Sequence, residues 1–355
     1  MFEDKKAKEI HNEMLNDISN EYDKTDGSFI YDTTKPSANQ FEKAYQSMNE
    51  VVEKFDVDNL TGEELERFIY QRTGQERRKA TFSVGELEVK GNGTINQGDL
   101  FETKSGVQFI STETKLINQV GNVKIRAVIP GNIGNTPAQQ IIEIPISLAG
   151  INSITNIYPT TDGYDEESDD DLRERYKERI RTPATSGNIY HYKSWAKEVP
   201  GVGEVKVIPL WNGDNTVKIV IIDSNMQPAS PLLVQEVQKH IDPNGTGLGD
   251  GQAPIGAYCT VISAIPIPIN LVFNATLKAG YSVEVAEENV SKMIVDYLKK
   301  IAFKQDFVSY AQSGSLILDS EGVEDYSNLK INDEVINVSI GNEEIAVLGG
   351  VEIVQ

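Results

Sequence analysis

The beginning of the chain alternates apolar and polar positions at helical spacing. Ile10, Met14, Ile18 and Tyr22 occur at every fourth position, which gives one apolar stripe along a helix. A second helix is predicted from about Pro36 to Phe55, with the proline near its first turn, where a missing N–H is tolerated. The first 75 or so residues are therefore predicted to be helical.

The apolar positions of the second helix are spaced alternately four and three residues apart. This average period of 3.5 residues is typical of a seam that packs against another helix. The seam consists of Phe41, Tyr45, Met48, Val52 and Phe55. A third helix is predicted to begin at Thr61, where Thr61-Gly62-Glu63-Glu64 resembles a capping box, and to stop at Gly74. The three helices can pack on each other, or the two long ones can dock against a partner protein, and the pattern leaves both open.

From about Phe82 to about Leu148, the pattern of apolar and polar residues is no longer helical. Short runs of alternating apolar and polar residues, such as Val123 to Ile129, are separated by turn signals such as Gly91-Asn92-Gly93 and Pro130-Gly131-Asn132. Alternation with a turn about every ten residues predicts a small antiparallel β domain.

Helices and strands are mixed in the remainder of the chain. Helices are expected at Asp165 to Arg181, Gly187 to Glu198, Ser230 to Ile241 and Val283 to Ile301, with a short helix or turn at Gly314 to Asp319. Strands are expected at Val202 to Leu210, Thr216 to Asp223, Tyr258 to Ile265 and Ile267 to Leu277. Asn337 to Ile340 and Glu344 to Leu348 are predicted to form a closing hairpin.

These elements predict an α+β multidomain protein. A length of 355 residues fits two to four domains. We expect a helical, bundle-forming segment at residues 1–78 and a β domain at 79–158. An α+β middle domain at 159–264 and an α+β C-terminal docking domain at 265–355 are expected to follow.

Charge and composition narrow the possible partners. A formal net charge of −21 argues against wrapping nucleic acid, which needs a basic face. The basic cluster Arg77-Arg78-Lys79 is interpreted as a solvated turn. No run approaches the roughly 20 apolar residues that span a bilayer, and the charged start lacks a signal core, so neither a membrane nor secretion is expected. The single Cys259 is predicted to be buried, and the lack of disulfides predicts folding in a reducing cytoplasm.

Candidate chemistry is weak throughout the sequence. The acidic run from Asp162 to Asp171 lacks the ligand spacing of a calcium loop and is better explained as the first turn of a helix. The loop from Gly245 to Gly251 follows a helix and is not followed by Gly-Lys-Ser/Thr, so it is interpreted as a connection rather than a phosphate site.

Nucleophilic and metal chemistry also find no support. His11, His191 and His240 have no second ligand at zinc spacing, and there is no Gly-x-Ser-x-Gly elbow. Paired carboxylates are numerous in so acidic a chain, but nothing singles out one pair. We therefore expect no catalytic residue, no metal ligand and no cofactor.

An ordered set of short motifs runs through residues 80 to 355. Its residues are Gly163, Asp165, Glu166, Asp171, Leu172, Arg173, Arg175, Gly187, Trp195, Gly201, Val202, Ala253, Pro254 and Gly256, preceded by Gly131 to Ala138. Each piece is unspecific alone, but in this order they resemble the baseplate J-like family of contractile phage tails and phage tail-like bacteriocins. Trp195 is expected to be a buried anchor rather than a surface hot spot.

The resemblance implies a structural baseplate wedge protein rather than an enzyme. Members of that family are present as two conformationally different copies joined with a second wedge subunit, and they link the central hub to the sheath. The resemblance implies that the amino-terminal helices enter an intersubunit bundle, that carboxy-terminal domains of neighbouring copies pair, and that a change of arrangement triggers contraction. The expected location is the tail baseplate of a virion or tailocin particle assembled in the bacterial host cytoplasm, with no nucleic acid or membrane as partner. The alternatives are a tail-associated cell-wall hydrolase and a component of a type VI or extracellular injection machine.

Overall fold

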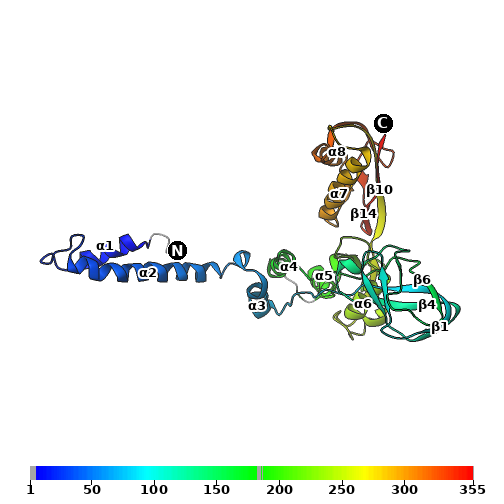
Figure 1. The fold of residues 1–355 in the computed structure, drawn as a ribbon, viewed down its shortest axis with the longest axis horizontal. Helices are drawn as coiled ribbons and strands as arrows, with labels where there is room; N and C mark the ends of the chain where they lie inside the picture. Colours follow the sequence, from blue (N-terminus) through cyan, green and yellow to red (C-terminus); the bar gives the residue numbers. More distant parts are fainter. Residues whose placement is uncertain (1–4, 182–184, 186, 355) are drawn as a thin grey trace. The chain divides into compact units, whose positions relative to one another are not determined.

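The structure, a computed structural model, describes residues 5–181, 185 and 187–354 (Figure 1). The chain divides into two units. The first consists of Met1–Arg77 and Ser168–Glu178, and the second of Arg78–Glu167 and Arg179–Gln355. The elements confirm the predicted α+β class, and the finer division into four domains stays a prediction.

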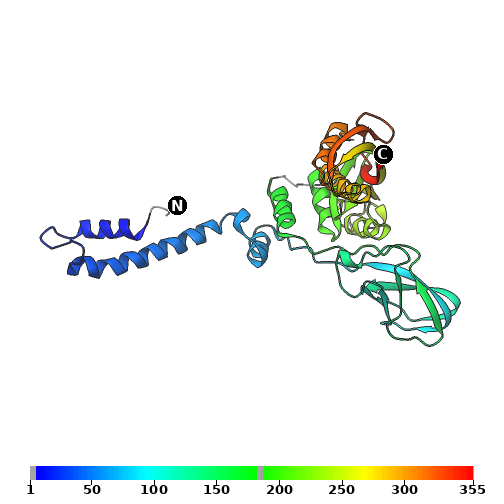
Figure 2. The same cartoon turned by 45° about the horizontal axis from the view of Figure 1, so that its top comes forward.

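The first unit is helical. It contains α1 (Ala7–Asp17), α2 (Phe29–Glu53), the 3-10 turn η1 (Val57–Asn59), α3 (Gly62–Thr73) and most of α4 (Asp169–Arg181). α1 lies alongside the first half of α2, as Figures 1 and 2 both show. A separate small core joins η1, α3 and α4 through Leu60, Leu65, Ile69, Leu172 and Tyr176.

Two predicted bounds in this unit are wrong because the caps lie elsewhere. α1 ends at Asp17, so Ile18 and Tyr22 lie beyond it. α2 begins at Phe29, because Ser28 accepts a hydrogen bond from the Tyr31 N–H and caps the helix. Pro36 therefore lies inside the helix, where it removes one backbone donor without ending the helix.

The second unit begins with the predicted antiparallel β domain. Its six-stranded sheet has the order β5-β2-β3-β4-β1-β6, and β5 also contacts β6, so the sheet curls toward a barrel. Its strands are β1 (Val84–Ile95), β2 (Leu100–Thr103), β3 (Gln108–Ser111), β4 (Lys115–Ala127), β5 (Ile141–Glu143) and β6 (Ile151–Thr155), with the 3-10 turn η2 (Asn132–Gly134). The side chains of Leu87, Phe101, Phe109 and Ile125 fill its interior.

The middle part of this unit is a three-stranded sheet with helices on one face. β7 (Val202–Pro209) pairs antiparallel with β8 (Thr216–Asp223), and β8 pairs parallel with β9 (Tyr258–Ser263). α5 (Ile189–Glu198) and α6 (Pro231–Ile241) pack on the sheet in one large core, and η3 (Pro243–Gly245) follows α6. The predicted strands at 202 and 216 are confirmed to within a residue.

The last part of the chain has a sheet of order β12-β10-β14. Its elements are β10 (Ile265–Leu277), α7 (Val283–Ile301), β11 (Phe307–Val308), α8 (Tyr310–Asp319), β12 (Val323–Ile331), β13 (Val338–Ser339) and β14 (Glu344–Val354). The helix at 283–301 is confirmed, and α8 begins earlier than expected because Ser309 caps it.

The predicted closing hairpin is wrong. β13 pairs with β11, whereas β14 pairs in parallel with β10. A two-residue strand cannot match the eleven apolar-rich positions of β14, while the thirteen-residue β10 can. β14 therefore pairs with the strand of similar length.

Candidate functional site

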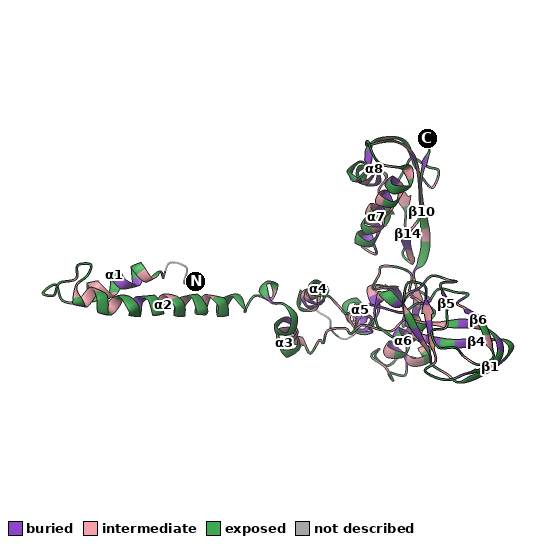
Figure 3. Ribbon diagram, viewed as in Figure 1, coloured by how far each residue is buried: buried purple, intermediate pink, exposed green. Residues whose placement is uncertain are grey.

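The seam predicted on the second helix lies on a solvent-exposed surface. Phe41, Tyr45, Met48 and Val52 lie on α2, and Phe55 lies in the turn after it. Phe41 is 52% exposed and Phe55 is 70% exposed, whereas Tyr45 is half-buried. Figure 3 shows how much of α2 is exposed along its length. The seam does not enter the small core of its own unit, which is built from η1, α3 and α4.

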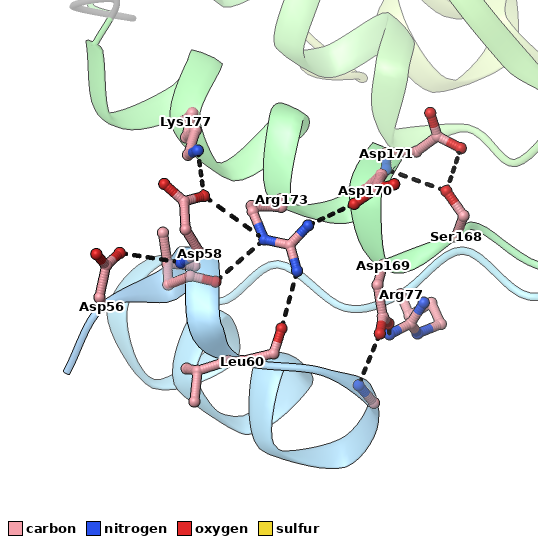
Figure 4. A network of polar contacts seen from close by, with 12 residues as sticks. Asp56, Asp58, Leu60, Arg77, Ser168, Asp169, Asp170, Asp171, Arg173 and Lys177 are labelled. Atoms are coloured by element: carbon pink, nitrogen blue, oxygen red, sulfur yellow. Dashed lines mark hydrogen bonds and ion pairs between the residues drawn. The ribbon is translucent and has the colours of Figure 1, made fainter. Parts of the chain in front are cut away.

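The amino-terminal turns of α4 carry the charged part of the family motif, and they hold η1 and α3 (Figure 4). Arg173 donates to the carbonyl of Val57 at 3.1 Å and to that of Leu60 at 2.8 Å, and it pairs with Asp170 at 2.6 Å. Asp58 pairs with Lys177 and lies 3.7 Å from the Arg173 guanidinium. Arg173 therefore gives a donor to the Leu60 carbonyl and a second donor to the Val57 carbonyl, which also accepts from the Leu60 N–H.

The cap of α3 comes from α4 and not from the predicted capping box. Thr61 precedes α3 but makes no side-chain cap hydrogen bond. The Asp169 carboxylate instead accepts from the Gly62 N–H at 2.9 Å and pairs with Arg77. These two donors hold the pKa of Asp169 below its ordinary value. The capping box was wrong because a distant carboxylate takes its place.

The interpretation of Arg77-Arg78-Lys79 as a solvated turn is wrong for the two arginines, whereas Lys79 is exposed. The Arg77 side chain is only 10% exposed, and it pairs with Glu66 at 2.6 Å as well as with Asp169. Arg78 is 16% exposed, donates to the carbonyls of Val202 and Lys197, and lies 4.0 Å from Glu167. The guanidinium donors find fixed acceptors here, which keeps both arginines out of solvent.

The glycine-tyrosine start of the motif belongs to the second unit. Asn132 donates through its backbone N–H and its amide to Asp165, both at 2.8 Å. Asn135 exchanges two hydrogen bonds with the backbone of Gly163. A Cβ on Gly163 would lie 2.5 Å from the carbonyl oxygen of Gly131, so this close approach requires glycine. These residues of the motif thus form a joint between the turn after β4 and the segment before α4.

Tyr164 extends this joint into the core of the middle sheet. Tyr164 is 5% exposed and packs among residues of α5, α6, β7 and β8. Gly201, at φ +94°, passes so close that a Cβ would lie 2.4 Å from the Tyr164 ring. The neighbouring Asp162 carboxylate accepts from Ser230, the residue that caps α6. Gly163, Tyr164 and Gly201 are therefore explained by packing.

The remaining motif residues are structural in the same sense. Leu172 and Val202 are fully buried, Ala253 and Trp195 are buried, and the Trp195 ring stacks on His191 at 4.1 Å. Pro254 lies against Gly187. Arg175 donates to the Glu76 carbonyl at 2.7 Å, and Asp171 accepts from Ser168. Glu166 is exposed, and Gly256 lies at φ +87° in the loop before β9.

α4 begins at Asp169 and not at Asp165 as predicted. Ser168 provides the start, since its hydroxyl accepts from the Asp171 N–H at 3.1 Å. Asp165 to Glu167 remain outside the helix because their carboxylates have partners elsewhere, Asp165 with Asn132 and Glu167 with the Arg78 N–H. Non-local pairing therefore decides where this helix starts.

The pattern missed two residues that protect the edge of the middle sheet. Gln238 accepts from the Val261 N–H at 2.8 Å and donates to the Cys259 carbonyl at 3.0 Å. The buried Asp242 accepts from the Cys259 N–H at 3.0 Å and from Gly247. These side chains pair with β9 as another strand would. The signal in the sequence was a polar Gln238 in the last turn of α6, four residues before the polar Asp242 that follows the helix.

Candidate chemistry is scarce in the part of the chain that the structure describes. Within it, no group of three or more His, Cys, Asp or Glu side chains is arranged to hold a metal ion. Burial raises the pKa of the Cys259 thiol to about 11, away from nucleophilic use. Burial also raises the pKa of Asp223 to about 6, with the Asp162 charge adding to the shift. Among the described helices, none is long and apolar enough to cross a bilayer.

Three family models match successive parts of this chain. The baseplate J-like protein barrel domain matches residues 79–163. The baseplate J-like central domain matches residues 184–263, and the baseplate J-like protein C-terminal domain matches residues 269–354. The matches coincide with the β domain, the middle sheet and the carboxy-terminal sheet.

Similar proteins include two from phages or phage-like elements. Phage-like element PBSX protein XkdT of Bacillus subtilis (strain 168) is 35% identical over 100% of this chain and 99% of its own length. Baseplate protein gp47 of Escherichia phage Mu is 31% identical over 56% of this chain and 57% of its own length. A chain in the cryo-EM structure of the anti-feeding prophage baseplate aligns with 96% of this chain and 90% of its own, at 10% identity and a TM-score of 0.39.

The helices and sheets define a multidomain α+β protein with an exposed apolar seam on α2. Its motif residues serve in packing and hydrogen bonding within the fold. The chain belongs to the baseplate J-like family. It is a structural subunit of the baseplate of a phage or tailocin particle.

Proposed function

We propose that this chain is a wedge subunit of a contractile tail, present as two copies in different conformations and joined with a second wedge subunit. The observation that carries the proposal is the exposed seam Phe41–Phe55. Large apolar side chains gathered on one face of a soluble protein mark an interaction surface. Their 3.5-residue period fits a helical bundle with helices from other subunits.

The carboxy-terminal sheet supports the second contact, pairing of neighbouring copies. The sheet ends in β14, which has β10 as its one strand partner among the described residues. β14 carries two glutamates and neither lysine nor proline. The opposite edge strand, β12, carries Glu324, Asp325 and Lys330. Charged edges resist strand addition, so β14 is the edge suited to a neighbouring copy.

The mechanism of such a wedge is mechanical. Interfaces between wedges, the hub and the sheath hold the baseplate in one arrangement, and contact with the host shifts them to a second that starts contraction. The tight joints around Tyr164 and around Arg173 favour movement of whole parts over deformation within them.

The seam is tested by replacing Tyr45 and Val52 with aspartate in a strain that makes all the other tail proteins. Two carboxylates on the seam should abolish particle assembly, because desolvating them in a bundle is unfavourable. The control, Gln46→Asp with Ser47→Asp, adds two carboxylates to the opposite, exposed side of α2.

Particles are counted by negative-stain electron microscopy, and circular dichroism checks that both variants fold. We expect at least a hundredfold fewer particles for the seam variant and normal numbers for the control. Normal assembly of the folded seam variant would refute the role of the seam.

A further inference from the structure

The exposed seam is one part of a longer apolar stripe on α2. Its alternating spacing of three and four residues extends backwards from Phe41 through Ala38, Thr34 and Tyr31. A stripe of constant 3.5-residue period faces one partner along its whole length when helices supercoil. The two halves of the stripe differ in what covers them. α1 lies on the earlier half, whereas the later half is exposed except for the half-buried Tyr45.

The contact between α1 and the stripe is small and partly polar. The His11 ring lies 4.5 Å from that of Tyr31, and its Nε2 lies 2.9 Å from the Thr34 hydroxyl. Ile10 and His11 are the buried residues of α1, and Ala38 is the buried residue of α2. So little buried apolar surface holds an eleven-residue helix weakly, since such a short helix is marginal alone.

The positions that flank the stripe carry few charges. Lys35, Glu42, Ala44, Asn49 and Val51 lie beside it, and Lys35 and Glu42 are the charged residues among them. In a chain with a net charge of −21, most surfaces would repel a second copy. Two parallel α2 helices, in contrast, would bring no like charges together across these flanking positions.

We propose that the docking surface for α2 of a second copy is the whole stripe from Tyr31 to Phe55, and that α1 is an internal occupant which the second copy displaces. This inference rests on the proposed function, because it takes the exposed seam as the subunit interface. Docking over the whole stripe buries more apolar surface than docking over the seam alone, which offsets the loss of the α1 contact. A chain with α1 bound and a chain with α1 released are then two conformations of one sequence.

The first test links α1 to α2 with His11→Cys and Thr34→Cys, whose native side chains are in contact. Self-association of the full chain is measured by sedimentation equilibrium, oxidised and reduced. The reduced form is the matched control, and Cys259 is buried and does not interfere. We expect a dissociation constant at least tenfold higher for the oxidised form. Equal constants would overturn the displacement of α1.

The second test loosens α1 with Ile10→Asp, which places a carboxylate at a buried position. Asn12→Asp adds the same charge on the exposed side of α1 and serves as control. We expect Ile10→Asp to associate about tenfold more tightly than the control. Unchanged or weaker association would count against the inference.

The two proposals fail in different ways. If Tyr45→Asp with Val52→Asp leaves self-association of the chain unchanged, the seam is not the interface and the proposed function loses its support. If that variant abolishes association while both α1 tests show no effect, the seam stands and only the displacement of α1 is refuted.

Discussion

Asp223 is a single residue whose negative charge opposes folding. Its carboxylate accepts from the backbone N–H groups of Asn225 and Gln227. Burial nevertheless raises its pKa from 3.8 to about 6, with Asp162 adding repulsion. The folded state binds the proton more tightly than the unfolded state, so stability is fully present below pH 4 and is lost as pH rises through 6.

We expect Asp223→Asn to remove this loss. The amide keeps an oxygen for the two N–H groups and carries no charge. At pH 7.5 the variant should be more stable by about 3 kcal/mol, because the pKa rises from 3.8 to about 6 and each pKa unit corresponds to about 1.4 kcal/mol. Near pH 4 the difference should vanish.

Urea unfolding followed by tryptophan fluorescence measures this, since Trp195 and Trp211 both lie in the middle part of the chain. Asp214→Asn, at an exposed position, is the control. A pH-independent difference between variant and wild type would disprove the role of the Asp223 charge.

Elements were predictable where their own residues define them. The strands at 202 and 216 and the helix at 283 are set by local alternation and by the caps around them. The start of α4, the cap of α3 and the pairing of β14 were not, because Arg78, Asp169 and β10 act from distant positions. The apolar period predicted the seam, and packing of the seam against another helix stays a prediction. The polar contacts of Gln238 and Asp242 could be found only from the packed structure.

The edge strands of the sheets differ in whether they are open to pairing with another strand. β9 is covered by α6, whose Gln238 takes the place of a strand partner. β12 is rich in charged residues, whereas β14 is not. Among the described residues, hydrogen-bonding side chains like that of Gln238 also leave most of the edge of β14 uncovered. This contrast is why we assign pairing between copies to β14.

We expect Gln238→Ala to lower the free energy of unfolding, because it leaves backbone groups of β9 without hydrogen-bond partners. The change removes the partners of the Val261 N–H and the Cys259 carbonyl, and unpaired buried groups cost about 1–3 kcal/mol each. We expect the urea midpoint to fall accordingly, whereas Gln235→Ala, on the exposed side of α6, should change it little. Faster amide exchange confined to residues 258–263 would locate the effect, and equal stability of the two variants would contradict it.

At the scale of the whole molecule, the two units have separate cores. Leu65 is fully buried in the small core of the first unit, and Val237 is fully buried in the core of the middle sheet, one of several in the second unit. Truncating either to alanine removes buried apolar surface and leaves a cavity, which costs roughly 2–5 kcal/mol for leucine and less for valine. If the units are separate cooperative bodies, each truncation should weaken only its own unit.

Hydrogen exchange measured by mass spectrometry tests this on the full chain. Leu65→Ala should speed exchange in α3 and α4 and leave β7 to β9 unchanged, and Val237→Ala should do the reverse. The two variants are each other's controls, because both remove apolar atoms from a fully buried site. Acceleration throughout the chain from either change would show one cooperative body, and movement of whole parts would then lose its structural basis. Separate responses would mean that a wedge can change arrangement while both cores stay folded, as a contraction trigger requires.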